Sequence, residues 1–365
     1  MNPKTSPGST TSSSFRTTEL PAFGEAAAAA ARAHQTQLTK PPGSLGRLEE
    51  LAVFFAGARG RFPVAAPERA RIYVFAADHG VAAEGVSPYP SSVTAAMVAN
   101  FIAGGAAISV LSRATGIELA VVDVGVASPI PGAGGAGVKL LSLPVRAGTA
   151  SFLREPAMSR AEAELALGIG ARLAGEAADE GVELLGAGEM GIGNTTAAAA
   201  VVAALTGAAP EAVVGRGTGV DDAGLARKIE VVRAALDRHA LDRGDALGAL
   251  AAVGGLEIAA MAGLMLGAAS RRVPVVVDGF ISGAAALVAT RLAPSVRDFL
   301  CFSHLSAERG HRVVCDALDA RPLFDLGMHL GEGTGAALAI NLLRAAVRLQ
   351  SEMATFASAG VANRE

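Results

Sequence analysis

Residues 72–80 read Ile-Tyr-Val-Phe-Ala-Ala-Asp-His-Gly, a short run of strand-forming residues that ends at a polar pair and a glycine. Similar β-rich runs recur along the chain, separated by Ala-rich helical segments, at residues 119–124, 182–185, 273–277 and 299–302. Strands that alternate with helices in this way are typical of a parallel sheet covered by helices. We therefore predict an α/β fold with a Rossmann-like parallel sheet.

The two ends of the chain differ in composition from this middle part. Residues 1–18 are rich in Ser, Thr and Pro and are predicted to form a disordered tail. Helical segments in residues 19–65, interrupted by a Pro-Pro-Gly loop, are expected to pack with the C-terminal segment 340–365 as a small helical domain. Residues 66–339 then form the large α/β catalytic domain.

The composition favours a small solute as the ligand. The net charge is −3, and the chain has no run of Lys and Arg that would indicate nucleic acid or an anionic membrane as a partner. Cys301 and Cys315 cannot form a disulfide framework, and the six histidines lack the spacing of a metal site. The uncharged stretches 86–112 and 190–210 do not contain about 20 consecutive apolar residues, so we predict buried loops and helices rather than membrane spans. Because the N-terminal segment also lacks the apolar part of a secretory signal, we expect a cytoplasmic protein.

Polar residues or glycines follow each predicted strand. In open α/β sheets ligands bind beyond the carboxyl ends of the strands, so these residues are predicted to meet in one crevice. They are Asp78-His79, Asp123, Gly188-Glu189, Asp278-Gly279 and Ser303-His304.

Two glycine-rich stretches carry the clearest chemical signal. Residues 331–335 read Gly-Glu-Gly-Thr-Gly, and residues 188–196 read Gly-Glu-Met-Gly-Ile-Gly-Asn-Thr-Thr. Glycines around a lone carboxylate allow close approach of the backbone to a ligand and leave N–H groups free for an anion. We interpret the pair as an anion site beside a positioned base.

The stretch 191–196 has two possible roles. It lies between a predicted strand and an Ala-rich helix, so its N–H groups could bind a phosphate at the start of that helix. The alternative is a purely structural helix start, with Asn194 or Thr195 as the N-cap residue. The stretch is not a P-loop, because it lacks the lysine, and it is not a dinucleotide fingerprint, because no acidic residue follows about 20 residues later.

Residues 215–222 form a further glycine loop, and Lys228 follows in the next predicted helix. Arg216 and Lys228 could both neutralise a phosphate. Taken alone, Lys228 also fits a solvent-exposed lysine on a helix surface.

The remaining polar groups indicate weaker alternatives. Asp78 and His79 have no nearby metal-binding partner motif, which favours a structural or ligand-orienting role. His304 and His311 are seven residues apart and fit histidines that line a polar crevice better than a zinc site. A triad of Ser303, His304 and Asp278 remains a minor alternative, because the chain has no Gly-x-Ser-x-Gly elbow.

With these motifs, the chain resembles the nicotinate-nucleotide:dimethylbenzimidazole phosphoribosyltransferases of cobalamin lower-ligand assembly, over about residues 20–350. The motifs that carry the resemblance are 39–46 (Thr-Lys-Pro-Pro-Gly-Ser-Leu-Gly), 77–81, 85–90 (Gly-Val-Ser-Pro-Tyr-Pro), 188–196, 215–222 with Lys228, 278–280, 303–311 and 326–335. The resemblance implies transfer of the phosphoribosyl group of nicotinate mononucleotide to 5,6-dimethylbenzimidazole, which gives α-ribazole 5'-phosphate and nicotinate. It implies a homodimer that uses neither a metal nor a cofactor.

The resemblance also implies roles for individual residues. Glu332 is expected to be the general base, and Glu189 is expected to orient the ring or to stabilise oxocarbenium character. The residues expected to hold the phosphoribosyl group are Gly191, Gly193, Asn194, Thr195, Gly217, Lys228, Ser306 and Gly331. Those expected around the incoming base are Ser87, Tyr89, Ser91, Met97 and Met190.

The chemistry of this reaction needs few groups. Nicotinate leaves from a cationic pyridinium and requires no general acid, whereas the attacking azole gains positive charge and must lose its N–H proton. One carboxylate with a pKa raised by an apolar pocket can accept that proton, and such proton transfer contributes about 10²- to 10⁴-fold to the rate.

Two residues depart from the family pattern, and three alternatives stay open. Ser91 stands where the family commonly has Gln, and Ser151 where it commonly has Asn. The acceptor could therefore be another benzimidazole, a purine or a phenol. A non-catalytic nucleotide-binding protein on the same scaffold is a second alternative, and a Rossmann oxidoreductase is disfavoured because the dinucleotide fingerprint is absent.

Overall fold

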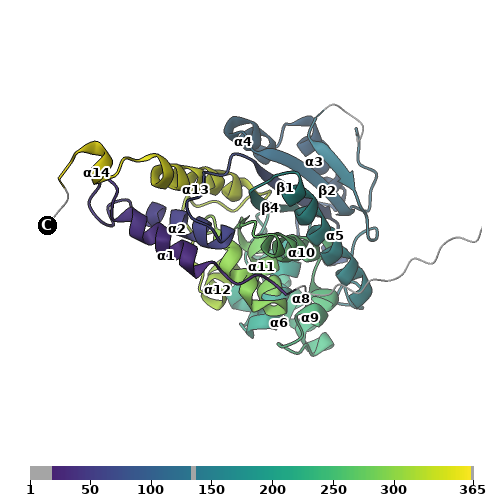
Figure 1. The fold of residues 1–365 in the computed structure, drawn as a ribbon. Helices are drawn as coiled ribbons and strands as arrows, with labels where there is room; N and C mark the ends of the chain where they lie inside the picture. The colour runs from purple at the N-terminus through teal and green to yellow at the C-terminus, as the bar shows by residue number, and fades with distance from the viewer. Residues whose placement is uncertain (1–18, 133–136, 363–365) are drawn as a thin grey trace, which may run out of the picture.

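The computed structural model describes residues 19–132 and 137–362, and the predicted tail 1–18 lies outside this part of the chain. Six parallel strands form one sheet in the order β3-β2-β1-β4-β5-β6. The strands are β1 (Ala70–Ala77), β2 (Glu118–Gly125), β3 (Lys139–Ser142), β4 (Leu184–Met190), β5 (Val275–Val277) and β6 (Leu300–Phe302). Helices cover both faces of the sheet (Figure 1), so the predicted Rossmann-like α/β fold is confirmed.

The α-helices of the described residues are α1 (Glu25–Gln35), α2 (Arg47–Arg59), α3 (Ser92–Ala103), α4 (Ala107–Thr115), α5 (Arg160–Asp179), α6 (Asn194–Thr206), α7 (Pro210–Val213), α8 (Asp222–His239), α9 (Ala246–Val253), α10 (Leu256–Ser270), α11 (Phe280–Leu292), α12 (Gly310–Ala317), α13 (Thr334–Glu352) and α14 (Phe356–Ala359). Two short 3-10 helices, η1 (Gly80–Glu84) and η2 (Pro294–Phe299), follow β1 and precede β6.

All five predicted strand runs belong to the sheet, but two details differ from the prediction. The short strand β3 was not predicted, since its four residues are half-buried or exposed and carry little apolar pattern. The run at 182–185 was placed too early, because β4 begins at Leu184 and continues to Met190. Gly186 and Gly188 have low intrinsic strand propensity, yet pairing of β4 with β1 extends the strand through both of them.

Alternating side chains of each strand divide the core into two layers. In β1, Tyr73 and Phe75 pack on one face with α5, α6, α9, α10 and α11, whereas Ile72 and Val74 pack on the other with α1, α2, α3, α4 and α13. This period of two follows from the geometry of a strand buried on both faces.

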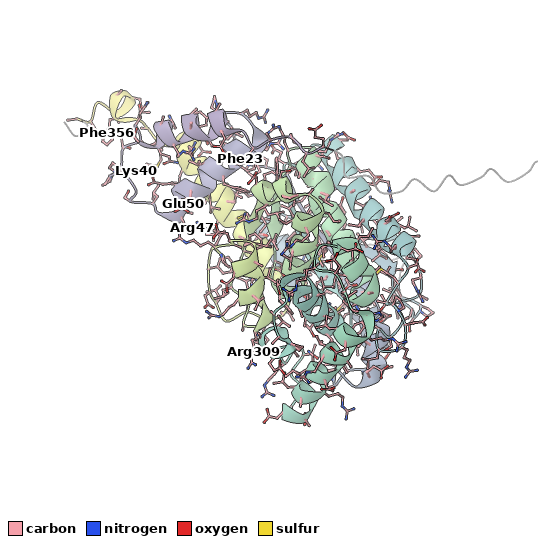
Figure 2. All side chains as sticks on the ribbon, turned by 90° about the horizontal axis from the view of Figure 1, so that it is seen from below. Phe23, Lys40, Arg47, Glu50, Arg309 and Phe356 are labelled. Atoms are coloured by element: carbon pink, nitrogen blue, oxygen red, sulfur yellow. The ribbon has the colours of Figure 1, made fainter. Side chains whose placement is uncertain are left out.

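The N-terminal helical segment and the segment that follows α13 lie side by side. A buried hydrogen bond joins Gln35 to Gln350, at 2.8 Å between Nε2 and Oε1, and an isolated β-bridge joins Leu38 to Thr355. Figure 2 shows Lys40 of the N-terminal segment near Phe356 of the C-terminal one. Helix α13 is continuous from Thr334 to Glu352, so the predicted boundary at 339/340 lies inside it; the division into two domains stays a prediction.

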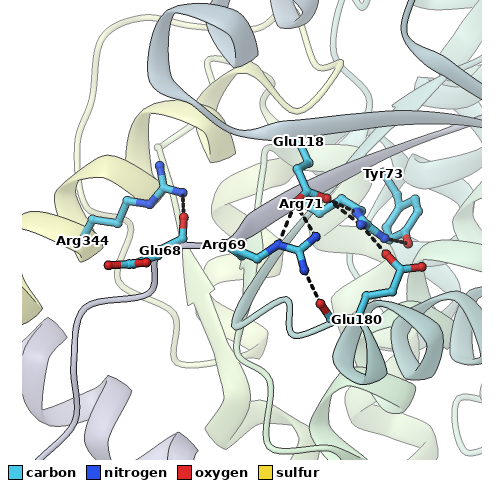
Figure 3. A network of polar contacts seen from close by, with 7 residues as sticks. All are labelled: Glu68, Arg69, Arg71, Tyr73, Glu118, Glu180 and Arg344. Carbon is cyan, nitrogen blue, oxygen red and sulfur yellow. Dashed lines mark hydrogen bonds and ion pairs between the residues drawn. The ribbon is translucent and has the colours of Figure 1, made fainter.

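The amino ends of β1 and β2 are joined by a network of ion pairs (Figure 3). Arg71 Nη2 lies 2.6 Å from Glu180 Oε2 and also contacts Glu118, which accepts a second hydrogen bond from Arg69 at 3.0 Å. These charges lie at the edge of the sheet opposite the carboxyl ends of the strands. The carboxyl ends therefore remain available for a ligand-binding site.

One stretch in the described residues, Ser92–Thr115, is long and apolar enough to cross a membrane by length and composition. In the structure this stretch is two helices, α3 and α4, and Gly104 ends the first with a φ of 81°. The predicted arrangement of a loop followed by helices is therefore present here.

Candidate active site

A cavity of about 880 Å³ opens at the carboxyl end of the sheet. Its lining comes from the end of β4, the turn before α6, the residues after β5 and β6, and the segment 326–334. Strands β1 and β4 are neighbours from which the chain proceeds to opposite edges, and ligands of open α/β sheets bind at such a switch point.

The prediction that five strand ends meet in one crevice is wrong for two of them. Asp78 and Asp123, at the ends of β1 and β2, do not line the cavity. Asp78 Oδ2 accepts a hydrogen bond from the Ala127 N–H at 2.8 Å, and Asp123 Oδ1 accepts one from Val126 at 2.9 Å. Both carboxylates therefore hold the backbone that follows β2.

The turn 191–196 presents the start of α6 to the cavity. Gly193 is the N-cap residue, with a φ of 98°, and no side chain caps the helix. Asn194 donates to Glu189 Oε2 instead, and Thr195 Oγ1 accepts a hydrogen bond from Lys228 Nζ at 3.0 Å. The alternative in which Asn194 or Thr195 is the N-cap is therefore wrong.

Lys228 is buried, with 1% of its surface exposed, so it is not a solvated surface lysine. Burial lowers the pKa of Lys228 to about 8, and the nearby Glu308 opposes this shift. Lys228 does not itself line the cavity, but it contacts Thr195, which does, and its ammonium lies against Gly217. Arg216 instead donates to the Val220 carbonyl at 2.9 Å within its own loop.

Glu332 sits in a turn of unusual backbone geometry. Its φ is 64°, a conformation that residues other than glycine rarely adopt, and its side chain is buried. Oε2 accepts a hydrogen bond of 3.4 Å from the N–H of Ile108, in the first turn of α4. Burial raises the pKa of Glu332, and this N–H lowers it in part.

Two glycines let this turn approach β4 closely. A Cβ at Gly188 would overlap the backbone of Glu332, and a Cβ at Gly331 would overlap the Glu189 carboxylate. Only glycine fits at either position, and so the two glycine-rich stretches form one site.

Glu189 is the second buried carboxylate of the cavity. Burial raises the pKa of Glu189 to about 8, the charges of Asp278 and Glu257 add to this increase, and the hydrogen bond from Asn194 opposes it. An apolar, partly acidic cavity of this kind can hold a carboxyl group that exchanges a proton near neutral pH.

Asp278, directly after β5, lines the cavity, as its place at a strand end predicted, although the sequence assigned it no role in phosphoribosyl transfer. It accepts hydrogen bonds from the N–H groups of Gly333, at 3.1 Å, and Ala336, at 2.9 Å, at the start of α13. Burial raises the pKa of Asp278 to about 7, and the backbone N–H groups oppose this shift. Its position at a strand end was the available signal.

The apolar end of the cavity contains three of the five residues expected around the base: Tyr89, Met97 and Met190. Ser87 and Ser91 do not line it. Ser87 Oγ lies 3.4 Å from Thr218 Oγ1, and Ser91 is an exposed residue at the start of α3. The segment 326–330 also lines the cavity, although the sequence assigned its residues no role.

Of the residues expected to hold the phosphoribosyl group, six line the cavity: Gly191, Asn194, Thr195, Gly217, Ser306 and Gly331. Lys228 and Gly193 lie directly behind this lining. Ser306 Oγ accepts a hydrogen bond of 3.3 Å from the N–H of Glu308.

The geometry argues against a hydrolase triad. Ser303 is buried, and its hydroxyl donates to the carbonyl of Asp278 at 2.7 Å. His304 Nδ1 is the ring nitrogen that faces both Ser303, at 3.0 Å, and Asp278, at 4.0 Å, whereas a triad uses the two ring nitrogens separately.

His79 and His311, which the sequence also singled out, have structural contacts. His79 and Glu257 form a fully buried pair, at 2.8 Å between Nε2 and Oε1, behind the turn at Gly191. His311 Nδ1 accepts a hydrogen bond of 2.8 Å from the Ser306 N–H. Within residues 19–132 and 137–362, no group of three His, Cys, Asp or Glu side chains could hold a metal ion.

A parallel sheet whose switch point holds an uncapped helix start, a buried lysine and two buried carboxylates defines an α/β enzyme that acts on a phosphorylated small molecule. A family model described as phosphoribosyltransferase matches residues 20–361. The chain belongs to this family, that of the nicotinate-nucleotide:dimethylbenzimidazole phosphoribosyltransferases, as its resemblance indicated.

Similar proteins agree with this assignment. Relatives named nicotinate-nucleotide–dimethylbenzimidazole phosphoribosyltransferase include those of Chloroflexus aggregans, 55% identical over 93% of this chain and 95% of the relative, and Roseiflexus sp. (strain RS-1), 56% identical over 93% and 95%. The crystal structure of CobT from Thermus thermophilus is 50% identical, with a TM-score of 0.87 over 93% of this chain and 100% of that one.

Proposed function

We propose that this enzyme transfers the phosphoribosyl group of nicotinate mononucleotide to 5,6-dimethylbenzimidazole or a related base, giving α-ribazole 5'-phosphate and nicotinate in cobalamin biosynthesis. The observation that carries the proposal is the buried Glu332 carboxylate beside an apolar pocket, in the same cavity as the uncapped start of α6.

The phosphate end of the site is built from α6. The positive end of the helix dipole at the start of α6 attracts the nucleotide phosphate, which Gly191, Asn194 and Thr195 surround. Lys228 adds positive charge through the contact of its ammonium with Thr195. Ser306 and Gly217 complete this end.

At the apolar end, one nitrogen of the azole attacks the anomeric carbon with its lone pair. The bond from that carbon to the pyridinium nitrogen breaks, and its electron pair neutralises the departing nicotinate ring. The new azolium then loses its remaining N–H proton to Glu332, whose raised pKa suits this transfer. Attack from the face opposite the leaving group inverts the anomeric centre from β to α.

Glu189 lies between the two ends. Its carboxylate is close to Gly331 and bonded to Asn194, so it contacts both glycine-rich turns. We propose that it orients the ring or stabilises the positive charge that develops on the ribose.

The apolar wall of the cavity is the part of the site that selects the acceptor base. Ser91, which departs from the family pattern, is exposed and does not line the cavity, whereas Met97 and Met190 give the pocket an adaptable apolar wall. Another benzimidazole, a purine or a phenol would contact the same wall. The family resemblance further supports a homodimer in the cytoplasm, which analytical ultracentrifugation and cell fractionation would test.

Nicotinate release in the presence of a panel of bases tests the function. The purified chain is incubated with nicotinate mononucleotide and 5,6-dimethylbenzimidazole, benzimidazole, adenine or phenol, and the fastest release is expected with a benzimidazole. Absence of release with any benzimidazole would refute the proposal. Nucleotide binding without turnover would instead support the non-catalytic alternative, and thermal protection by NAD but not by nicotinate mononucleotide would support an oxidoreductase.

A further inference from the structure

Asp278, from a distant part of the chain, accepts backbone N–H groups at the start of α13. The residue follows β5, 55 positions before Gly333, and both of its oxygens are used: Oδ2 accepts the Gly333 N–H and Oδ1 accepts the Ala336 N–H. The N-cap residue of α13 is Gly333, and no side chain of its own segment caps the helix. Asp278 therefore supplies the hydrogen-bond acceptor that this helix start would otherwise lack.

The turn held by Asp278 contains Glu332. The φ of 64° at Glu332 is unfavourable for a residue with a side chain, and such a conformation persists only where the surroundings enforce it. The Gly333 N–H that bonds to Asp278 belongs to the peptide directly after Glu332. Loss of that bond would let the backbone of Glu332 relax and would move its carboxylate.

Asp278 is itself fixed by its neighbours. Its N–H lies 3.3 Å from Ser282 Oγ, and its carbonyl accepts the Ser303 hydroxyl at 2.7 Å. Its side chain is buried, with 2% exposed. Because both oxygens already accept backbone N–H groups, the carboxylate is placed to hold the turn rather than to take a proton from the substrate.

We infer that Asp278 is a positioning residue, which holds the Glu332 carboxylate in the orientation required to remove the azole proton. This inference rests on the proposed role of Glu332 as the base. The motif 278–280 contains none of the residues expected to hold the phosphoribosyl group or the base, and this inference gives it a function.

The first test is Asp278→Asn. Asn keeps one oxygen acceptor, but its NH₂ group would face one of the two backbone N–H groups, so the turn should loosen. We expect kcat to fall by about 10²-fold, the cost of a misplacement of about 1 Å, while the affinity for nicotinate mononucleotide is retained. Asp123→Asn is the matched control, since it changes a buried aspartate at the end of β2 that bonds backbone N–H groups outside the cavity.

A double-mutant cycle separates positioning from a general loss of structure. If Asp278 acts through Glu332, then Asp278→Asn in a Glu332→Gln background should lower kcat by less than about threefold further, because the group it positions is already gone. Multiplicative losses in the double variant would overturn the inference, as would an unchanged kcat in the single variant.

The controls distinguish the possible failures. A wild-type chain without nicotinate release refutes the proposed function, and a Glu332→Gln variant with near-native turnover refutes the role of the base. If Asp278→Asn does not fold, as judged by its circular dichroism and melting curve, Asp278→Glu enters the same cycle. That variant keeps the charge but displaces it by one methylene, so we expect it to lower kcat. In the Glu332→Gln background the same substitution should lower kcat no further. Multiplicative losses in that double variant would again contradict the inference.

Discussion

The turns at 191–196 and 331–336 begin their helices in the same way but have different occupants. Each is a Gly-x-Gly turn whose second glycine is the N-cap residue of a helix, with a φ of 98° at Gly193 and 89° at Gly333. In both, the residue after that glycine donates its N–H to the carbonyl of the first glycine, at 3.1 Å.

The difference lies in what occupies the helix start. Asp278 accepts N–H groups at the start of α13, whereas no carboxylate in the described part of the chain accepts a backbone N–H from the first turn of α6. One turn is completed by the protein and holds a base, and the other is left for an anion from solution. Local sequence makes the turn, and the tertiary surroundings decide its role.

The largest expected effect comes from removing the base at the 331–336 turn. Glu332→Gln keeps the shape of the side chain but cannot accept the azole proton, so kcat should fall by about 10²- to 10⁴-fold while nucleotide binding remains. Steady-state kinetics and calorimetric titration with nicotinate mononucleotide measure the two quantities. Glu176→Gln, at an exposed position of α5, is the control. Near-native turnover of Glu332→Gln would show that the 331–336 turn does not hold the base.

The second change removes the cation behind the 191–196 turn. Lys228→Met fills the same buried space without the charge, and loss of a charge-assisted contact should raise KM for nicotinate mononucleotide by about 10- to 100-fold. The value of kcat should change less. Lys139→Met, on the exposed part of β3, is the control. A fall in kcat at unchanged affinity would instead place Lys228 in the chemical step.

The two turns should also respond to pH in opposite directions. Glu332 must be ionised to accept a proton, so kcat should fall as the pH drops through its raised pKa. Lys228 is charged below its pKa of about 8, so nucleotide affinity should fall as the pH rises above that value. The pH profiles of kcat and KM measure this, and the alkaline loss of affinity should disappear in Lys228→Met but persist in Glu189→Gln.

The smallest expected effect is on the pH dependence of stability, through Glu189, which contacts both turns. Burial raises the pKa of Glu189 from 4.5 to about 8, so between these values the folded state holds a proton that the unfolded state releases. The folded state is therefore destabilised as the pH rises through this window. Glu189→Gln should melt several degrees above the wild type at about pH 8.5 and close to it at about pH 5, as scanning calorimetry would show; equal differences at both pH values would contradict the shift.

Much of the fold could be predicted from the sequence, because the pattern of short apolar runs and Ala-rich helices reflects strands buried on both faces. The strand that was missed, β3, lacks that pattern. The second half of β4 was missed because Gly186 and Gly188 have low strand propensity, although pairing with β1 extends the strand through them. Alternation therefore predicts which segments are strands, while their bounds depend on their neighbours.

The candidate site was predictable to a lesser degree. The glycine-rich turns and their carboxylates stand out in the sequence because few residues tolerate positive φ or close backbone contact. The burial of Lys228 did not stand out, since one lysine on a helix looks the same in sequence whether it faces solvent or the core.

By itself, the sequence determined the α/β class, the two Gly-x-Gly turns and the resemblance to the phosphoribosyltransferase family, since each of these depends on residues that are near one another in the chain. Only the tertiary structure decided that Asp278 occupies one helix start and leaves the other open, and that the ends of β1 and β2 are not part of the cavity. These outcomes depend on contacts between segments far apart in the chain, which local propensity does not encode.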